Sequence, residues 1–201
     1  NRYLYERLVP SCCTSEDILL LEDSRLIGGS LGTKRHKVML FGKMLAGKTM
    51  FFQNMIKNQP NHSLRATVRV DFSVASFAIG PDEENRFSLQ VWDTPGISRF
   101  AQINAGYGRG SHCFVFMVPL NDDESIGWLR DHHALYCSGL LEETKCIVIG
   151  TKKDLKKDNR LSYDLISYCA QNHTPYYECD LRDHEQMFRV LYAIMHYLPQ
   201  T

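Results

Sequence analysis

The feature that most constrains this chain is a glycine-bounded run of eight residues between a strand-like stretch and a helix-like stretch. It reads Gly42-Lys43-Met44-Leu45-Ala46-Gly47-Lys48-Thr49, which is the pattern G-x-x-x-x-G-K-T. The apolar residues 38–41 precede it and the helix-like residues 50–56 follow it. In this setting the backbone N–H groups of the loop surround a phosphate, and the start of the helix adds its dipole. The run therefore predicts a loop that binds the phosphates of a nucleotide.

Two side chains of this loop have specific expected roles. Lys48 is expected to reach the β- and γ-phosphates, and the Thr49 hydroxyl to take one coordination position of Mg²⁺. The other residues of the run, together with Met50 at the start of the helix, are expected to line the phosphates.

The composition allows one domain plus a tail and gives no charge-driven partner. The chain has 201 residues, with 23 Lys and Arg against 23 Asp and Glu, so no global field attracts nucleic acid and none is expected as a partner. No apolar stretch approaches the roughly 20 residues that span a bilayer. The 7 cysteines form no C-x-x-C pair and several lie in apolar runs. Buried thiols in a reducing, cytoplasmic compartment are therefore expected.

Strand and helix signals alternate from residue 34 onward. Strands are predicted at 37–41, 67–79, 86–92, 113–118, 145–149 and 175–178, and helices at 48–57, 124–137, 162–171 and 183–198. Residues 81–85 predict a hairpin turn, and the last helix carries an amphipathic stripe that predicts core. This alternation predicts an α/β sheet, mostly parallel, with helices on both faces.

Residues 1–33 read differently and are predicted to be an N-terminal extension of the domain at 34–201. Within the extension, residues 18–21 follow a helix-cap pattern, but they fit a strand equally well. A glycine-rich stretch, 28–32, resembles a flexible joint between the two parts.

Further segments stand at strand–loop junctions, where such sheets bind ligands. In Asp93-Thr94-Pro95-Gly96, Asp93 is expected to hold Mg²⁺ through water and the Gly96 N–H to meet the γ-phosphate. Thr67 lies 18 residues after Thr49 and is expected to complete the Mg²⁺ coordination when a γ-phosphate is present. Each motif alone is commonplace, because Asp and Gly are frequent in turns. Their order along the chain favours a shared site.

Two later segments point to the base of the nucleotide. In Thr151-Lys152-Lys153-Asp154, the Asp154 carboxylate can accept both hydrogens that guanine offers at N1 and N2, and the Lys152 stem can lie over the base. In Asp180-Leu181-Arg182, after the last strand, a backbone N–H is expected to meet guanine O6. Adenine lacks the N1 and N2 donor pair, so these residues predict guanine as the base.

From about residue 36 to 198 the sequence resembles a Ras-superfamily small GTPase, above all the Rab branch. The stretch 67–72 (TVRVDF) resembles T-[IV]-G-[IV]-D-F, and 89–100 (LQVWDTPGISRF) resembles L-Q-I-W-D-T-A-G-Q-E-R-F. Residues 107–112 (YGRGSH) resemble Y-Y-R-G-A-H, and 121–125 (NDDES) resemble T-D-x-E-S. The resemblance implies a P-loop small G domain with a six-stranded, mostly parallel sheet, one antiparallel strand and about five helices.

The resemblance also implies GTP or GDP with Mg²⁺ as cofactors, and Lys48, Thr67 and Gly96 as the catalytic residues. It implies an effector protein that binds the switch segments around 58–72 and 93–108, and an exchange factor and a GTPase-activating protein as further partners. The protein is expected in the cytoplasm, peripheral on the cytosolic face of a membrane. Membrane contact is expected to be indirect, or to use a C-terminal tail missing from this sequence.

The departures from the family pattern concentrate on hydrolysis. Ile97 stands where the family has the Gln that orients the attacking water, and its side chain can form no hydrogen bond. Met44 stands where a Gly or small residue usually lies beside the γ-phosphate. These residues predict slow or absent hydrolysis. Two alternatives stay open: compensation elsewhere in the chain, or a water-positioning group from another source, as in Era- and TrmE-like GTPases with an apolar residue there.

Other departures concern binding but leave the main contacts in place. Arg69 replaces a Gly of the switch motif, residues 58–66 lack the usual aromatic residue, and Asp180-Leu181-Arg182 stands for S-A-K. Thr151 replaces the usual Asn, as in Rho-like members. We therefore expect a guanine-nucleotide switch that recruits effectors in vesicle or membrane traffic. The alternative is a pseudo-GTPase that holds nucleotide as a fixed subunit of a complex; an unrelated P-loop enzyme is disfavoured by T-K-x-D.

Overall fold

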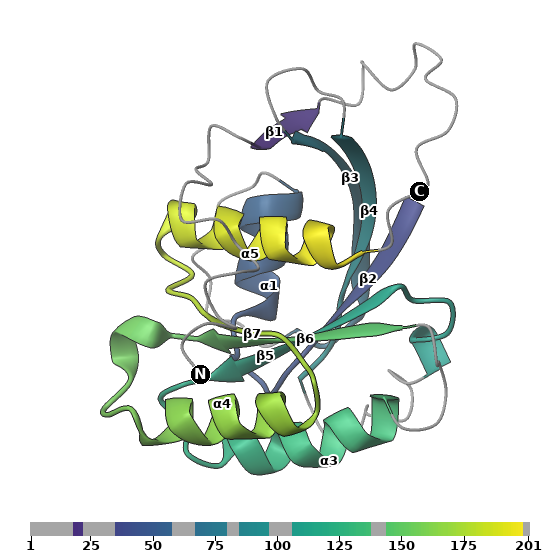
Figure 1. The fold of residues 1–201 in the computed structure, drawn as a ribbon. Helices are drawn as coiled ribbons and strands as arrows, with labels where there is room; N and C mark the ends of the chain where they lie inside the picture. The colour runs from purple at the N-terminus through teal and green to yellow at the C-terminus, as the bar shows by residue number, and fades with distance from the viewer. Residues whose placement is uncertain are drawn as a thin grey trace.

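The computed structural model describes residues 18–21, 35–57, 67–79, 85–96, 106–137 and 144–198. They form one seven-stranded sheet with helices on both faces (Figure 1). The strands are β1 (Ile18–Leu21), β2 (Arg35–Phe41), β3 (Asp71–Ile79), β4 (Asn85–Asp93), β5 (Cys113–Pro119), β6 (Lys145–Thr151) and β7 (Tyr176–Glu178). The helices are α1 (Lys48–Phe51), the π-helix η4 (Phe52–Ile56), α3 (Ser125–Cys137), the 3-10 helix η6 (Lys153–Leu155), α4 (Arg160–Gln171) and α5 (His184–Tyr197).

The strand order across the sheet is β1-β3-β4-β2-β5-β6-β7. Strand β2 pairs in parallel with β4 and β5, and the parallel pairing continues through β6 to β7. Strand β3 runs antiparallel to β4, as the one antiparallel strand of the expected sheet. All six predicted strands are present, but the one predicted at 67–79 begins only at Asp71, so Thr67 lies in the irregular segment before it. The predicted hairpin turn at 81–85 lies outside the described residues except for Asn85, which begins β4.

The seventh strand comes from the segment before residue 34. Strand β1 adds to the sheet edge beside β3, with Ile18 opposite Ile79 and Leu21 opposite Ser76. The sequence allowed either a short helix or a strand at residues 18–21, and the structure shows the strand. An edge strand leaves a row of backbone N–H and C=O groups without partners, and β1 supplies partners for those of β3. A local sequence pattern cannot reveal such a pairing, because the partner strand lies about 60 residues away along the chain.

The number of helices is slightly lower than expected. The described residues hold four α-helices, against about five implied by the resemblance. The predicted helix 48–57 is α-helical only over Lys48–Phe51 and continues as η4, in which the Lys57 N–H donates to the Phe52 carbonyl (3.1 Å). Bonding five residues back in this way widens the turn. The widened turn keeps Phe52, Met55 and Ile56 buried.

The hydrophobic core forms two layers, one on each face of the sheet. One layer packs α1, η4 and α5 against the sheet, and the other packs α3 and α4 against the opposite face. Every residue of β5 is buried, as expected for a central parallel strand covered on both faces. The predicted stripe of α5 lies in the first layer, with all its members buried: Met187, Val190, Leu191, Ile194, Met195 and Leu198.

Strand β3 turns its alternating side chains in a direction that the sequence did not fix. Its buried face carries Ala75 and Phe77, whereas Phe72 on the other face is half exposed. Val68, before the strand begins, is also exposed. Alternation identifies which residues share a face, but the packing of a helix against the sheet decides which face becomes core.

Cysteine burial agrees with the expectation for three residues. Cys113, Cys169 and Cys179 are free and buried, and burial raises the pKa of each thiol to about 12. They are therefore uncharged and unreactive at neutral pH. Cys146 differs, because it is disulfide-bonded. Within the described ranges, no helix combines the length and the apolar character needed to cross a membrane.

Candidate functional site

The loop after β2 has a backbone that depends on close contacts with other elements. Gly47 has φ 97°, and a Cβ at this position would overlap the Leu181 side chain from the loop between β7 and α5. Glycine alone avoids both the strained φ and the overlap. Leu45 has φ 62° despite its side chain, which costs about 1–2 kcal/mol relative to a right-handed conformation. The loop thus holds a strained shape that its neighbours maintain.

Lys48 is the first residue of α1, directly after this loop, and is almost fully buried, with 4% of its surface exposed. Its Nζ donates to the carbonyl oxygens of Gly42 (2.7 Å) and Lys43 (2.8 Å). Burial lowers the pKa of Lys48 to about 8, and the nearby Asp93 carboxylate opposes that shift. A buried ammonium enclosed by a turn of backbone can exchange its carbonyl partners for phosphate oxygens.

Thr49, Thr67 and Asp93 meet beside Lys48, although they come from three separate parts of the chain. The Thr49 hydroxyl donates to Asp93 Oδ2 (2.6 Å), and its oxygen lies 2.5 Å from Thr67 Oγ1. Asp93 is 1% exposed, and burial raises the pKa of its carboxyl to about 6, against the opposing effects of Thr49 and Lys48. These are the three residues that the sequence assigns to Mg²⁺.

The donor set fits a magnesium ion. Asp93 Oδ1 is buried and has no hydrogen-bond partner among the described residues, which leaves one carboxylate oxygen available to a ligand. Mg²⁺ prefers oxygen ligands and usually takes one or two carboxylates together with waters and substrate phosphates. No group of three or more His, Cys, Asp or Glu side chains in the described ranges could hold a metal alone. The oxygens present therefore suit an ion that phosphates help to bind.

Gly96 brings the end of β4 against the phosphate-binding loop. A Cβ on Gly96 would lie 2.5 Å from the Lys43 carbonyl carbon and would overlap the Met44 nitrogen. No other residue fits this approach without moving the loop. Met44 itself is 52% exposed. Ile97, the residue on which the hydrolysis expectation depends, lies outside the described residues, as do 58–66 and 97–105.

Three contacts support the loop in ways that the sequence motifs did not reveal. Thr151 Oγ1 donates to the buried Ala46 carbonyl (2.8 Å), so its side chain bonds the phosphate loop. Thr94 Oγ1 donates to the Leu40 carbonyl (2.6 Å) at the end of β2. Lys43 Nζ pairs with Asp122 (2.6 Å). The sequence gives residue types at these positions, but their partners are 54 to 105 residues away.

Burial and the neighbouring positive charge shift the pKa of Asp122 in opposite directions. Partial burial is the largest single influence and favours the neutral carboxyl, but the hydrogen bonds from Lys43, the Glu124 backbone and Ser125, together with the Lys43 charge, outweigh it and lower the pKa of Asp122. The ion pair with Asp122 thus connects Lys43 of the loop to the turn before α3.

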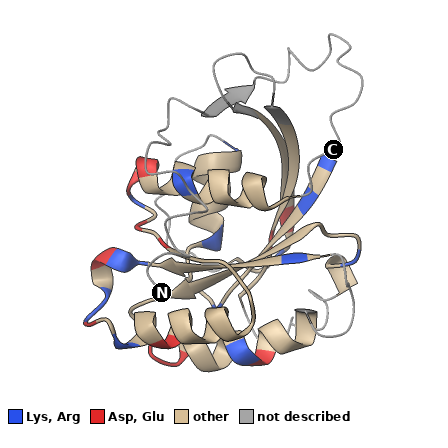
Figure 2. Cartoon of the chain, viewed as in Figure 1, with Lys and Arg blue, Asp and Glu red and all other residues tan. Residues whose placement is uncertain are grey.

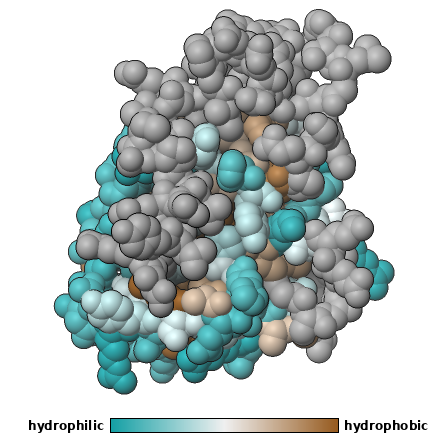
Figure 3. Space-filling view, in the orientation of Figure 1, coloured by the Kyte–Doolittle hydropathy of each residue, from teal (hydrophilic) through white to brown (hydrophobic). Residues whose placement is uncertain are grey.

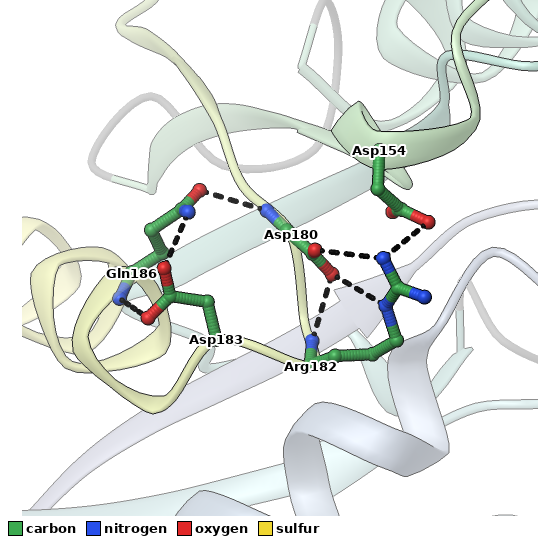
Figure 4. Close-up of polar contacts among 5 residues, drawn as sticks. All are labelled: Asp154, Asp180, Arg182, Asp183 and Gln186. Carbon is green, nitrogen blue, oxygen red and sulfur yellow. Dashed lines mark hydrogen bonds and ion pairs between the residues drawn. The ribbon is translucent and has the colours of Figure 1, made fainter.

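The expected base-binding residues lie at the other end of the site. Lys152 and Asp154 follow β6, and Lys152 adopts a left-handed conformation (φ 56°) just before η6. The Asp154 carboxylate pairs with the Arg182 guanidinium, with Nη2 2.7 Å from Oδ2. The Arg182 Nη2 is also 3.0 Å from Asp180 Oδ2, as Figure 4 shows. Leu181, between Asp180 and Arg182 in the chain, is buried.

The structure therefore brings the predicted residues together at two ends of one site, and both ends contact the loop after β2. The residues at the phosphate end are Lys48, Thr49, Thr67, Asp93 and Gly96. The residues at the base end are Lys152, Asp154, Asp180, Leu181 and Arg182. Leu181 joins the two ends through its contact with Gly47, and Thr151 joins them through Ala46. Met50 packs against the core from the partly buried side of α1.

A cluster of aromatic side chains lies on the surface near the end of β4. The Phe72 and Trp92 rings stack with centroids 4.8 Å apart, and the Tyr107 ring is 5.7 Å from Trp92. Phe72 and Tyr107 are 51% and 42% exposed. Lys37 covers Trp92 with its ammonium 4.8 Å from the ring centroid. We call Phe72, Trp92 and Tyr107 the aromatic cluster.

Charges around the site have mixed sign. In Figure 2 basic and acidic residues alternate along the segment between β6 and α4, where the sequence has Lys152, Lys153, Asp154, Lys156, Lys157, Asp158 and Arg160. On the face drawn in Figure 3, hydrophilic side chains dominate the described surface over α4, and apolar areas there are small. No single-sign patch of the kind that attracts a polyanion appears on these described elements.

Comparisons with known proteins agree with this geometry. The family model described as "Ras family" matches residues 37–200. The Ras-related protein Rab-36 of Mus musculus is 32% identical over 132 residues, which cover 63% of this chain and 47% of Rab-36. GTP-binding protein ypt4 of Schizosaccharomyces pombe is 29% identical over 144 residues, covering 68% of this chain and 59% of ypt4.

Ypt/Rab-type GTPase ypt7 of Schizosaccharomyces pombe is 27% identical over 161 residues, covering 76% of this chain and 77% of ypt7. The matched part of this chain spans about half the length of Rab-36, with 47% covered.

Proposed function

Since the chain belongs to the Ras family and resembles Rab-type GTPases, we propose that it is a guanine-nucleotide-binding molecular switch that works with Mg²⁺. The observation that carries the proposal is the meeting of Thr49, Thr67 and Asp93 beside the buried Lys48. A cation and a set of oxygen ligands at adjacent positions suit a phosphate chain with its metal ion.

Each residue at the phosphate end of the site has a role in this proposal. Lys48 would bind the β- and γ-phosphates, and Thr49 and Thr67 would hold Mg²⁺, with Asp93 acting through water. The bound ion neutralises charge on the phosphate oxygens. The Gly96 N–H would meet the γ-phosphate. Thr67 and Gly96 belong to the two switch segments, so a ligand that bonds both can order these segments, which is how a γ-phosphate produces a second state.

The proposal includes slow hydrolysis. Ile97 offers no hydrogen bond to orient an attacking water, and the exposed Met44 side chain stands beside the expected γ-phosphate position. Activation by a GTPase-activating protein is worth roughly 10³–10⁵ in rate where the usual parts are present. With Gln absent and Met44 in the path of an incoming arginine, both routes to fast turnover are weakened.

The aromatic cluster supports effector recruitment as the output of the switch. Phe72 belongs to the segment 58–72, Tyr107 belongs to 93–108, and Trp92 directly precedes the latter, so the cluster exposes large apolar rings from both expected switch segments. Aromatic side chains are enriched where proteins bind one another. We propose that an effector binds here during vesicle or membrane traffic at the cytosolic face of a membrane. An exchange factor and a GTPase-activating protein complete the proposed partners, and membrane contact is indirect or uses a C-terminal tail.

The first test identifies the nucleotide that the purified protein carries. The protein is purified with Mg²⁺ throughout, denatured, and its nucleotide is resolved by ion-exchange chromatography. Mostly GTP supports a switch with slow hydrolysis. Mostly GDP contradicts slow hydrolysis but keeps guanine binding, whereas adenine nucleotide, or none together with no uptake of added GDP, contradicts the proposed function.

The second test restores the missing side chain. Single-turnover hydrolysis is measured for the wild type, Ile97→Gln, and Ile97→Leu as a control of similar volume. We expect Ile97→Gln to raise the rate by about tenfold or more and Ile97→Leu to leave it unchanged. Equal rates in all three proteins would show that another group positions the water.

A second candidate is a fixed subunit that holds nucleotide without cycling. Ile97 and Met44 favour it, because a locked state needs no hydrolysis. A switch requires two states that differ in affinity for a partner, and a scaffold requires one. Exchange of bound nucleotide against an excess of labelled GDP separates them, since a fixed subunit should retain its original nucleotide.

A further inference from the structure

Three charged residues at the base end, Asp154, Asp180 and Arg182, form a connected set that includes the expected guanine ligand. Arg182 lies on the loop between β7 and α5, while Asp154 belongs to η6 after β6. The Arg182 Nη2 is 2.7 Å from Asp154 Oδ2. The side chain of Asp154 is 16% exposed and that of Arg182 is 65% exposed, so the guanidinium approaches the carboxylate from the solvent side.

Asp180 holds Arg182 in this position by three hydrogen bonds. Its Oδ1 accepts from the Arg182 backbone N–H (2.9 Å) and from Nε (3.2 Å), and its Oδ2 accepts from Nη2 (3.0 Å). A guanidinium bound at two nitrogens has a fixed plane and direction. The arginine is therefore directed toward Asp154 by its neighbour two residues earlier.

The start of α5 in turn fixes Asp180. Asp183 caps α5 by accepting from the backbone N–H groups of Glu185 (3.0 Å) and Gln186 (3.3 Å). The Gln186 side chain donates to Asp183 Oδ2 (2.7 Å) and accepts from the Asp180 backbone N–H (3.0 Å), as Figure 4 shows. Five residues thus form one chain of contacts from a helix cap to Asp154.

We propose that Arg182 closes the guanine-recognition edge of the nucleotide-free protein by occupying the donor position at Asp154, so that guanine must displace it to bind. This inference rests on the proposed function, because it assigns Asp154 to guanine. The carboxylate would otherwise accept the N1 and N2 hydrogens of the base, and the Arg182 N–H presents the same kind of donor to one oxygen of that carboxylate, Oδ2. Arg182 and guanine therefore compete for one acceptor.

Competition of this kind affects association more than dissociation. The Arg182–Asp154 pair exists only while the base is absent, so it lowers the fraction of protein ready to bind. Removing the guanidinium should raise the association rate and leave the dissociation rate unchanged. Because Arg182 is largely exposed, added salt should weaken the pair and reduce the difference between wild type and variant.

The test follows binding of fluorescent mant-GDP, with Mg²⁺, to the nucleotide-free 201-residue chain by stopped flow. The variants are Arg182→Ala, which removes the competing donor, and Asp180→Asn, which weakens the anchor while keeping its shape. Arg189→Ala is the matched control, because it removes an exposed arginine of α5 that pairs only with Glu185 at 3.7 Å among the described residues.

We expect Arg182→Ala to bind mant-GDP about two- to fivefold faster, with an unchanged dissociation rate. Asp180→Asn should show a smaller increase, Arg189→Ala none, and the gain of Arg182→Ala should shrink in high salt.

Slower association or faster dissociation in Arg182→Ala would overturn the inference, because Arg182 would then support the bound base. Unchanged rates in both variants, with normal wild-type binding, would overturn it while leaving the proposed function in place. No mant-GDP binding by any of the four proteins would overturn both.

Discussion

The two ends of the candidate site differ in how far their charged groups are withdrawn from water. At the phosphate end, Lys48 and Asp93 are 4% and 1% exposed, and their pKa values move toward neutrality, to about 8 and about 6. At the base end, Arg182 is mostly exposed and pairs with two carboxylates. Buried charges are costly without a partner, whereas exposed pairs are screened and weak.

This difference indicates that the two ends contribute differently to ligand binding. The phosphate end holds its groups in place before a ligand arrives, with one carboxylate oxygen left over. At the base end the Asp154 carboxylate already pairs with Arg182, so a base that binds Asp154 must replace that contact. Large effects on binding are therefore expected from the phosphate end, and small effects from the base end.

The largest effect is expected from Lys48→Ala. Two short hydrogen bonds from a buried ammonium show that this group is enclosed where phosphate oxygens would lie. Loss of charge-assisted hydrogen bonds to phosphate should weaken mant-GDP binding by about 100-fold or more. Equilibrium fluorescence titration measures it. Lys145→Ala, which removes an exposed lysine of β6, is the control; equal affinities in the two variants would break the comparison.

A second effect should appear as the pH is lowered. The proposed Mg²⁺ site uses the ionised form of Asp93, whose pKa burial raises from 3.8 to about 6. Below pH 6 a proton competes with the metal, so Mg²⁺-dependent mant-GDP affinity should fall by about tenfold per pH unit. Titrations between pH 5 and 7.5, with Mg²⁺ or with EDTA, measure it. An equal slope in EDTA would assign the effect to another group.

The same shift has the opposite sign for stability of the nucleotide-free protein. Because the folded-state pKa of Asp93 lies above the unfolded value, the native state holds the extra proton between pH 3.8 and about 6. The Asp93 contribution to the free energy of unfolding should therefore decline as pH rises through this window. Asp93→Asn should remove this part of the pH dependence, as urea unfolding at several pH values would show.

A third, smaller effect is expected from Thr151→Val, which keeps the shape but removes the hydroxyl. The buried Ala46 carbonyl would lose its bond from Thr151 Oγ1, at about 1–3 kcal/mol in the free energy of unfolding. Urea denaturation measures the loss, and Thr151→Ser is the matched control that retains the donor. If Thr151→Ser is as unstable as Thr151→Val, the methyl packing matters and the hydrogen bond does not.

The smallest effect is expected from Lys156→Ala beside the base end. Lys156 Nζ donates to Glu178 Oε2 (3.0 Å), and both side chains remain partly exposed, at 23% and 17%. Glu178 also accepts a hydrogen bond from the Tyr176 hydroxyl (3.1 Å), which survives the substitution. The free energy of unfolding should fall by less than about 1 kcal/mol. A larger loss would show that the base end is as tightly built as the phosphate end.

Much of the fold follows from local pattern in the sequence. The β-branched and aromatic runs mark the six predicted strands, and the spacing along 183–198 marks α5, because each pattern reflects the period of one element. Strand β1 and the exposed face of β3 do not follow, since both depend on which distant segment packs alongside. The π-helical turn of η4 has no local signal that separates it from an α-helix.

The site divides in the same way. The motifs predicted which residues come together at the phosphate end of the site. Glycines, a lysine and short side chains with oxygen atoms at those spacings suit phosphate and Mg²⁺. The motifs did not predict that Thr151 supports Ala46, or that Arg182 pairs with Asp154. Those partners lie on different loops, and only the parallel order of β2, β6 and β7 brings the loops to one edge of the sheet.

By itself, the sequence determined the chemical types available to this protein: a phosphate-binding loop, oxygen ligands for a hard cation, a carboxylate suited to guanine, and Ile97 where a water-orienting side chain is expected. The tertiary structure alone decided the state of those groups. It buried Lys48 and Asp93 and shifted their pKa values, and it left Arg182 exposed against Asp154. The physical reason is that burial and pairing arise from contacts between distant segments, which sequence spacing does not encode.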